Sequence, residues 1–255
     1  MPQAARVLPV GRIYPSRIYP SRIYPNIDLS DWQCAVLLEP CHHSQQTPSI
    51  DVRRLGERVA DACLLQSVPL HRVGSVRVAT LMPSGRPVAT IDDRAAPVCV
   101  SLSHTRLMRA AVACAEAFVG IDLVEMRPAT AAPCRGKPYR RSQSLDAWFT
   151  QSELGLLAAC TILTREMLWA AKEAAYKAAR LDTEFRPRQL TIEHASGNRF
   201  RWSIFDRWAT VSGAGVFFIA ADHIVAIAAA RMPEPATLVP HARPPAALPM
   251  EKAFS

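Results

Sequence analysis

Residues 118–126 read FVGIDLVEM, an apolar stretch with an acid, Asp122, at its centre. β-Branched and aromatic residues fill it, so we predict a buried strand. A carboxylate between Ile121 and Leu123 stays ionised there only beside a cation or hydrogen-bond donors. Two interpretations are open from this stretch alone: an acid that caps a turn at the strand end, or an acid held in place by a partner.

Strand and helix patterns extend from this stretch in both directions. Upstream, the spacing predicts a helix over 55–66, a strand over 75–81, a turn at 83–87, a strand over 98–104, and then a helix through Ala117. Downstream, it predicts helices over 145–160 and 164–180, then antiparallel strands in QLTIEH, FRWSIF, GVFFIAA and HIVAIAAA. Because two strand–helix assemblies meet near residue 120, we predict an α+β fold.

The two ends of the chain differ in composition from the part between them. Residues 12–26 repeat RIYPS, RIYPS and RIYPN, and proline at every fifth position excludes a continuous helix. Proline is also frequent in 232–249. We therefore predict a flexible arm over 1–30, an N-terminal subdomain over 31–118, a C-terminal subdomain over 119–231 and a proline-rich tail over 232–255.

The 255-residue chain carries a formal charge of +8, which predicts anionic partners without choosing among nucleic acid, phosphate-rich cofactor and acidic protein. Its seven cysteines are odd in number and scattered, as in a reduced compartment. The longest apolar stretch, about 208–230, is interrupted by Asp222 and His223. We expect a cytoplasmic protein without a membrane partner.

The segment WAAKEAAYKAAR, 169–180, predicts a helix with two unlike sides. One side gathers the charged and aromatic residues Trp169, Lys172, Glu173, Tyr176, Lys177 and Arg180. The other gathers Met167, Leu168, Ala171, Ala174, Ala175 and Ala178, which can lie close against a neighbouring element. A solvated face with a Glu173–Lys177 pair accounts for the charges but not for the two large aromatics.

Polar residues follow the apolar strand over 98–104. SLSHT, 101–105, places Ser103 and His104 at a predicted strand end. Such a cluster either caps the next helix or binds phosphate. The turn SGRP, 84–87, adds Arg86 upstream.

These motifs, in this order, resemble the 4′-phosphopantetheinyl transferase superfamily. The resemblance rests on Gly120-Ile121-Asp122, then WFTQSE, then Trp169-Ala-Ala-Lys172-Glu173 closed by Lys177. SGRP and SLSHT resemble the N-terminal half of its Sfp-type branch, and together the motifs span about 50–230. The resemblance implies two similar α/β subdomains fused as a pseudo-dimer that works as a monomer.

The resemblance also implies a reaction, the transfer of the phosphopantetheine arm of coenzyme A (CoA) to a carrier-protein serine with release of 3′,5′-ADP. Asp122 and Glu173 are then the Mg²⁺ ligands, Glu173 is also the base for the serine, and Lys177 holds the phosphate oxygens. Such ligands suit Mg²⁺ because it favours a few hard oxygens completed by substrate and water.

Further residues match the family's cofactor contacts. Lys172 resembles a phosphate contact, Ser103 with His104 resembles a clamp on the 3′-phosphate of CoA, and Arg86 lies in the adenine-nucleotide neighbourhood. Many Sfp-type members carry a second acid two residues after the Asp, where this chain has Val124. We expect a water in its place, because Glu125 points to the opposite side of the strand.

Acidic carrier domains are the protein partners that the resemblance implies. A basic docking face for them comes from the segment between the motifs, as Arg127, Arg135, Lys137, Arg140 and Arg141. The alternative for this segment is a solvated basic loop. Two other functions remain as alternatives: a non-catalytic relative that binds CoA or a carrier, and a basic nucleic-acid-binding protein. The sequence lacks the aromatic-studded strands of the latter, so we expect no nucleic-acid partner.

Overall fold

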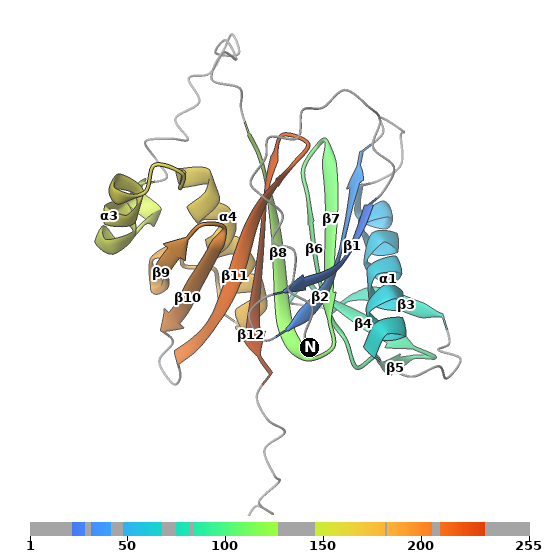
Figure 1. Cartoon of the computed structure of the whole chain (residues 1–255). Coiled ribbons are helices and arrows are strands. Elements are labelled where there is room, and N and C mark those ends of the chain that lie inside the picture. The colour runs from blue at the N-terminus through green and yellow to red at the C-terminus, as the bar shows by residue number, and fades with distance from the viewer. Residues whose placement is uncertain are drawn as a thin grey trace, which may run out of the picture.

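The structure is a computed structural model that describes residues 22–28, 32–41, 48–67, 75–81, 84–126, 146–181, 183–205 and 210–232. Within these residues the chain forms three sheets in which every strand pair is antiparallel, with a few helices packed against them. The α+β class predicted from the sequence is therefore confirmed. Figure 1 shows the two larger sheets side by side, with α1 and α3 at opposite ends of the molecule.

The first sheet is built from residues before 115 and has the order β1-β2-β7-β6. Its strands are β1 (Arg22–Asp28), β2 (Gln33–Pro40), β6 (Cys99–His104) and β7 (Met108–Cys114). Helix α1 (Pro48–Ser67) lies against β7, β6 and β2 and buries Leu55, Val59 and Cys63, which agrees with the predicted helical spacing. A small sheet of β3 (Val76–Leu81), β4 (Arg86–Ile91) and β5 (Arg94–Ala95) packs beside α1 and β6.

The second sheet is built from later residues and has the order β8-β12-β11-β10-β9. Its strands are β8 (Ala117–Glu125), β9 (Leu190–Ser196), β10 (Arg199–Phe205), β11 (Thr210–Ala220) and β12 (His223–Arg231). The other elements of this half are η1 (Asp146–Trp148), α3 (Gln151–Ala159), α4 (Arg165–Ala179) and η2 (Pro187–Gln189). The strands predicted downstream of residue 118 and the helix over 164–180 are confirmed, whereas the helix predicted over 145–160 is corrected in part, since η1 is separated from α3, which begins only after the cap at Thr150.

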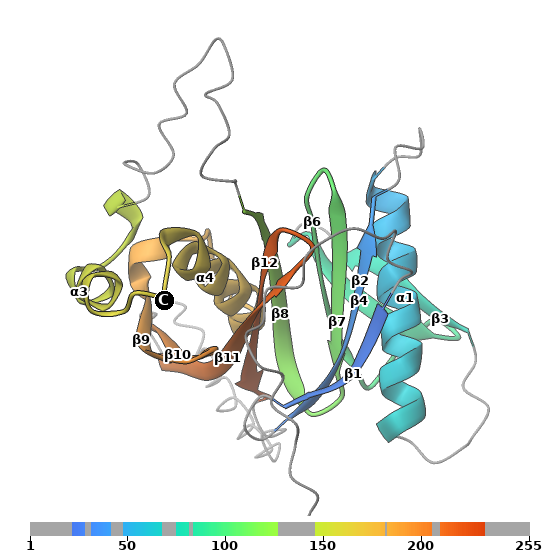
Figure 2. The same ribbon diagram turned by 45° about the horizontal axis from the view of Figure 1, so that its top comes forward.

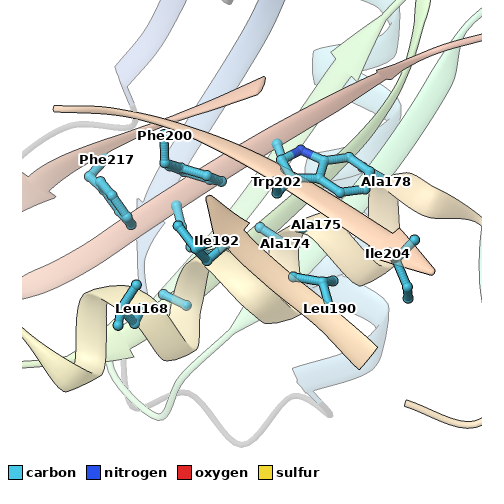
Figure 3. Close-up of a cluster of buried hydrophobic side chains, with 14 of the residues drawn as sticks. Leu168, Ala174, Ala175, Ala178, Leu190, Ile192, Phe200, Trp202, Ile204 and Phe217 are labelled. Atoms are coloured by element: carbon cyan, nitrogen blue, oxygen red, sulfur yellow. The ribbon is translucent and has the colours of Figure 1, made fainter. Parts of the chain in front are cut away.

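Helix α4 lies on the second sheet through its alanines. Ala174, Ala175 and Ala178 are fully buried, and Trp202 and Ile192 extend from the strands toward them (Figure 3). Figure 2 shows α4 and α1 on their separate sheets, with β8, β6 and β7 between them. Small side chains on one helix face let a helix backbone come close to a strand. The charged side chains of α4 are therefore brought close to β8.

The helix predicted between 104 and Ala117 is wrong. Met108–Cys114 forms β7, a central strand that pairs with β2 on one side and β6 on the other. Ala110 through Cys114 are fully buried, so this strand shows no alternation of polar and apolar residues. Alanine-rich segments favour helices locally, but ladder hydrogen bonds on both edges outweigh that preference.

The flexible arm predicted over 1–30 is corrected in part. Arg22–Asp28, which includes the whole third repeat, forms β1 and pairs with β2. The first two repeats, the basic segment 127–145 and the tail after Met232 lie outside the described residues. Among the residues that the structure covers, no helix has the length and apolar character needed to cross a membrane.

Candidate functional site

Asp122 lies in the middle of β8 and is buried, with 4% of its surface exposed. Its carboxylate oxygen Oδ1 accepts hydrogen bonds from Ser103 Oγ (3.1 Å) and from Lys177 Nζ (2.8 Å). Lys177 Nζ also donates to the carbonyl oxygen of Ile121 (2.8 Å). Of the two interpretations of this acid, the structure supports an acid held in its strand by a cation and hydrogen-bond donors.

Gly120 explains how a helix side chain reaches this strand. A Cβ added at Gly120 would lie 1.9 Å from the carbonyl oxygen of Ala174 and 2.7 Å from the backbone nitrogen of Ala178. Only glycine allows such an approach of two backbones. The Gly-Ile-Asp motif therefore combines a contact point for α4 with the acid that α4 then faces.

Helix α4 begins after Thr164, whose side chain accepts a hydrogen bond from the backbone of Met167. From that start, Glu173 and Lys177 fall one turn apart on the edge that faces β8. Lys177 remains partly exposed, with 32% of its side chain accessible, so its ammonium reaches solvent as well as Asp122.

Glu173 lies beside Asp122, although the two belong to different elements. The pKa of Glu173 is raised to about 7, first by burial and then by the negative charge of Asp122 and a hydrogen bond between the two carboxyls, while Lys177 and a hydrogen bond from Trp169 act in the opposite direction. The carboxyls of buried Asp122 and half-buried Glu173, with one neighbouring ammonium, form an acid-rich pair that a divalent cation would neutralise.

The two carboxylates fit Mg²⁺ by their chemistry, because hard oxygen ligands in small number are what this ion accepts from proteins. Within the described part of the chain, no group of three or more His, Cys, Asp or Glu residues could hold a metal. The site therefore offers two protein ligands, and substrate oxygens and waters would have to complete the coordination. Val124 is half-buried and Glu125 is exposed at the end of β8.

Lys172 is not on the solvent-facing side of α4, which corrects the sequence prediction. It is fully buried and lies 2.8 Å from Glu153 Oε2, which is also fully buried. Its other protons go to the carbonyl oxygens of Pro187 and Leu190. A fully buried ammonium cannot reach a phosphate, so Lys172 is left out of the ligand-binding set.

The WFTQSE motif supplies the other half of this buried ion pair. Thr150 and Glu153 form a capping box at the start of α3, and Glu153 Oε1 also accepts a hydrogen bond from the backbone of Ile192 (2.8 Å). Phe149 lies under the ammonium of Lys172, 5.9 Å from ring centroid to Nζ. The motif therefore fixes α3, α4 and β9 together, and among the described residues it is linked to the site through α4.

A cavity of about 710 Å³ lies between the β3–β4 hairpin, β6, β8 and the end of α4. Three cationic residues line it: Arg86, Lys177 and Arg180. Arg86 donates to the carbonyl oxygen of Leu181, and Arg180 to that of Pro87 (3.4 Å), so each half of the chain contacts the other across the cavity. Arg180 and Tyr176 were not among the site residues chosen from the sequence, although helical spacing places both near Lys177.

His104 and Ser103 are placed differently from Arg86. His104 is exposed at the end of β6 opposite Arg109, and neither His104 nor Ser103 lines the cavity. Ser103 is buried against Asp122 instead. The structure thus brings Asp122, Glu173, Lys177 and Ser103 together, with Arg86 across the cavity.

The two large aromatics of α4, Trp169 and Tyr176, both pack against Phe185 near this site. Trp169 makes edge contacts with Trp148 and Phe185, with ring centroids 6.3 and 5.8 Å away. Tyr176 contacts Phe185 at 4.8 Å and lines the cavity. Their packing accounts for the aromatics that a plain solvated face left unexplained.

Paired carboxylates beside a cationic cavity are typical of enzymes that transfer phosphate-linked groups, because these reactions need charge neutralisation and exact placement. Residues 118–228 match the family model ACPS, described as the 4′-phosphopantetheinyl transferase superfamily. This match covers less than half of the chain, includes Asp122, Glu173 and Lys177, and agrees with the superfamily that the motifs predict, so it supports a transferase activity. A search of curated proteins gives no match to the chain.

Proposed function

We propose that this protein transfers the 4′-phosphopantetheine arm of CoA to a serine of a carrier protein in a Mg²⁺-dependent reaction that releases 3′,5′-ADP. The observation that carries the proposal is the meeting of Asp122 and Glu173 beside Lys177, at the edge of a cationic cavity. The superfamily match over 118–228 supports it independently.

The cavity suits the nucleotide end of CoA. Its volume of about 710 Å³ lies within the range of ordinary small-molecule sites. Arg86, Lys177 and Arg180 supply positive charge for the phosphates, and apolar residues from β6 and β8 supply a wall for the adenine. In this proposal His104 approaches the 3′-phosphate from the exposed end of β6, outside the cavity itself.

Asp122 and Glu173 would hold Mg²⁺, which neutralises charge on the pyrophosphate when bound. Glu173 takes the proton of the carrier serine as its oxygen attacks the phosphorus that bears the pantetheine. The new oxygen–phosphorus bond replaces the bond to the bridging pyrophosphate oxygen, and 3′,5′-ADP leaves with that oxygen. Lys177 holds the phosphate oxygens and offsets the charge that develops on them.

We assign the chain to the Sfp-type branch as a cytoplasmic monomer with two fused halves, and we propose acidic acyl or peptidyl carrier domains as partners. A helix on an antiparallel sheet in each half supports the branch. The basic docking segment over 127–141 lies outside the described residues and stays a prediction.

The test is a mass measurement on an apo carrier incubated with the protein, CoA and Mg²⁺. We expect a phosphopantetheine-sized gain, lost with EDTA and reduced at least about a thousandfold in rate by Glu173→Gln, since a base and a metal ligand are removed together. Glu166→Gln, the same change two turns earlier on α4, is the matched control and keeps the rate.

The same assay separates the alternatives. CoA binding without any gain in carrier mass, over carriers from fatty-acid, polyketide and peptide pathways, would point to a non-catalytic relative. Salt-sensitive binding to DNA or RNA without CoA affinity would point to a nucleic-acid-binding protein.

A further inference from the structure

Among the strands that the structure describes, β8 has a backbone partner on one edge only. β8 pairs with β12 on one side, while on the other side β6 runs alongside it but belongs to a different sheet. Side chains of β6 fill the role of the missing ladder. Cys99 Sγ, Ser101 Oγ and Ser103 Oγ accept the backbone N–H groups of Val119 (3.4 Å), Ile121 (3.2 Å) and Leu123 (3.2 Å), respectively.

This arrangement follows from the period of two in both strands. Every second residue of β6 points toward β8, and every second N–H of β8 points toward β6. Buried N–H groups need such acceptors, because a buried donor without a partner keeps the cost of its lost hydration. The row of three small acceptors therefore joins the two sheets at the place where Asp122 lies.

Ser103 differs from the other two members of the row. Its oxygen accepts the N–H of Leu123, and its hydroxyl proton goes to Asp122 Oδ1, 3.1 Å away. Ser103 is 8% exposed and Asp122 is 4% exposed, so the bond is shielded from water. Cys99 and Ser101 contact no carboxylate in the described structure.

We propose that Ser103 is a positioning residue that fixes the Asp122 carboxylate for a divalent cation, and is not a contact of the CoA 3′-phosphate. The inference rests on the proposed function in taking Asp122 as a cation ligand. Ser103 and Lys177 both bind Oδ1, so neither occupies the second carboxylate oxygen, Oδ2, where a cation would take the place of the hydrogen bond between the two carboxyls.

The physical basis is the orientation of a metal ligand by its neighbours. The hydroxyl of Ser103 holds one oxygen of the Asp122 carboxylate in place before the cation binds. The side chain of Asp122 therefore loses little rotamer freedom on binding, which favours a higher affinity for the cation. Ser103 is itself anchored by Leu123 N–H, one residue beyond Asp122, so hydroxyl and carboxylate are held by the same strand. A hydroxyl that already donates to Asp122 has no proton left for a phosphate.

The experiment titrates the full chain with Mn²⁺, a paramagnetic substitute for Mg²⁺, and measures free Mn²⁺ by electron paramagnetic resonance, with and without saturating CoA. We expect Ser103→Ala to weaken Mn²⁺ binding about tenfold or more, the size of effect seen when the support of a metal ligand is removed. Ser103→Thr, which keeps the hydroxyl, should recover most of the affinity.

Cys99→Ala is the matched control, because it removes an acceptor from the same row without touching a carboxylate. It should leave Mn²⁺ affinity unchanged. If Ser103→Ala does not fold, Ser103→Cys gives the same comparison with a weaker donor of similar size, and an intermediate loss is expected. Equal losses in Cys99→Ala and Ser103→Ala, or no Mn²⁺ binding by the wild type, would overturn the proposal.

A second measurement compares the affinities for CoA and 3′-dephospho-CoA. A positioning role leaves the ratio of these affinities unchanged in Ser103→Ala, whereas a 3′-phosphate contact lowers it toward one and overturns the proposal. The Mn²⁺ titration without CoA needs neither cofactor nor carrier. It therefore tests Ser103 even if the transfer assay fails, so the two failures can be told apart.

Discussion

The two halves of the molecule each place a helix on an antiparallel sheet, but the contact differs. At Gly56 on α1, an added Cβ would meet the end of a flexible side chain, Leu102 Cδ2, at 2.9 Å. At Gly120 under α4, it would meet the helix backbone itself, the oxygen of Ala174, at 1.9 Å. Contact between backbones brings the charged edge of α4 onto β8, and the carboxylate pair forms there.

The same contrast holds for the ion pairs of the two halves. Glu153 and Lys172 on the α4 side are both fully buried, whereas Arg58 and Glu39 on the α1 side have 49% and 25% of their side chains exposed. The superfamily match covers the α4 half. We infer that the first half serves as a wall for the cavity and as the support of β8, while the second half carries the chemistry.

The largest expected difference between the halves lies in these ion pairs. Lys172→Met leaves the Glu153 carboxylate buried without its cation, which should lower the free energy of unfolding by about 4 kcal/mol. Arg58→Met removes a solvent-screened partner and should cost less than about 1 kcal/mol. Urea unfolding of both variants measures this, and equal costs would mean that the buried pair contributes no more than the exposed one.

The next difference lies in the glycines. Gly120→Ala forces α4 away from β8 and should cost about 3 kcal/mol, the upper range for overpacking a core. Gly56→Ala meets only a side-chain methyl and gains helix propensity, so we expect a change within about 0.5 kcal/mol of zero. Thermal unfolding of the two variants compares the contacts. If Gly120→Ala lowers the free energy of unfolding no more than Gly56→Ala does, the backbones of β8 and α4 are not in contact at Gly120.

The pH dependence of stability should be specific to the α4 half. In the cation-free protein the pKa of Glu173 is raised from 4.5 to about 7, mainly by burial and then by Asp122. The folded state therefore holds a proton that the unfolded chain releases above pH 4.5, so its stabilising effect is lost as pH rises through 7. We expect a loss of about 2 kcal/mol between pH 5 and pH 8.5.

Urea midpoints in EDTA at these two pH values measure that loss. Glu173→Gln should remove it, and Glu166→Gln on the same helix should retain it. Mg²⁺ with CoA should reverse part of the loss at pH 8.5, since a cation favours the ionised pair. A decline of equal size in Glu173→Gln would assign the pH dependence to other groups.

The smallest expected effect concerns the cap of α3. Thr150→Ala removes one side of the capping box and should lower the free energy of unfolding by about 1 kcal/mol. Gln151→Ala, at the exposed next residue, is the control, with an expected change of less than about 0.5 kcal/mol. A transfer rate that falls far more than stability in Thr150→Ala would indicate that α3 reaches the site directly.

The sequence predicted the α4 half well because its local signals agree with its tertiary contacts. The alanine face, the Thr164 start and the Gly120 contact point all favour the same packing of α4 on β8. The first half was less predictable. In β7 the alanines favour a helix locally, and only pairing with two strands distant in sequence makes it a strand.

The sequence predicted those features of the site that depend on the spacing of residues within one helix or one strand. Helical spacing placed Glu173 and Lys177 on one edge correctly, but it could not distinguish a charge that meets water from one that meets a buried partner. Lys172 therefore looked like a ligand contact, because Glu153 is distant in sequence. Likewise, the hydrogen bond between Ser103 and Asp122 could not be predicted from the sequence, because the two residues lie on strands of different sheets.

The most direct test of the central claim is a crystal structure with CoA and Mn²⁺, in which anomalous scattering locates the cation. We expect one strong peak between the carboxylates of Asp122 and Glu173, with the CoA pyrophosphate completing its coordination and the nucleotide in the cavity beside Arg86 and Arg180. A cation bound elsewhere, or CoA bound with no cation touching either carboxylate, would contradict the account.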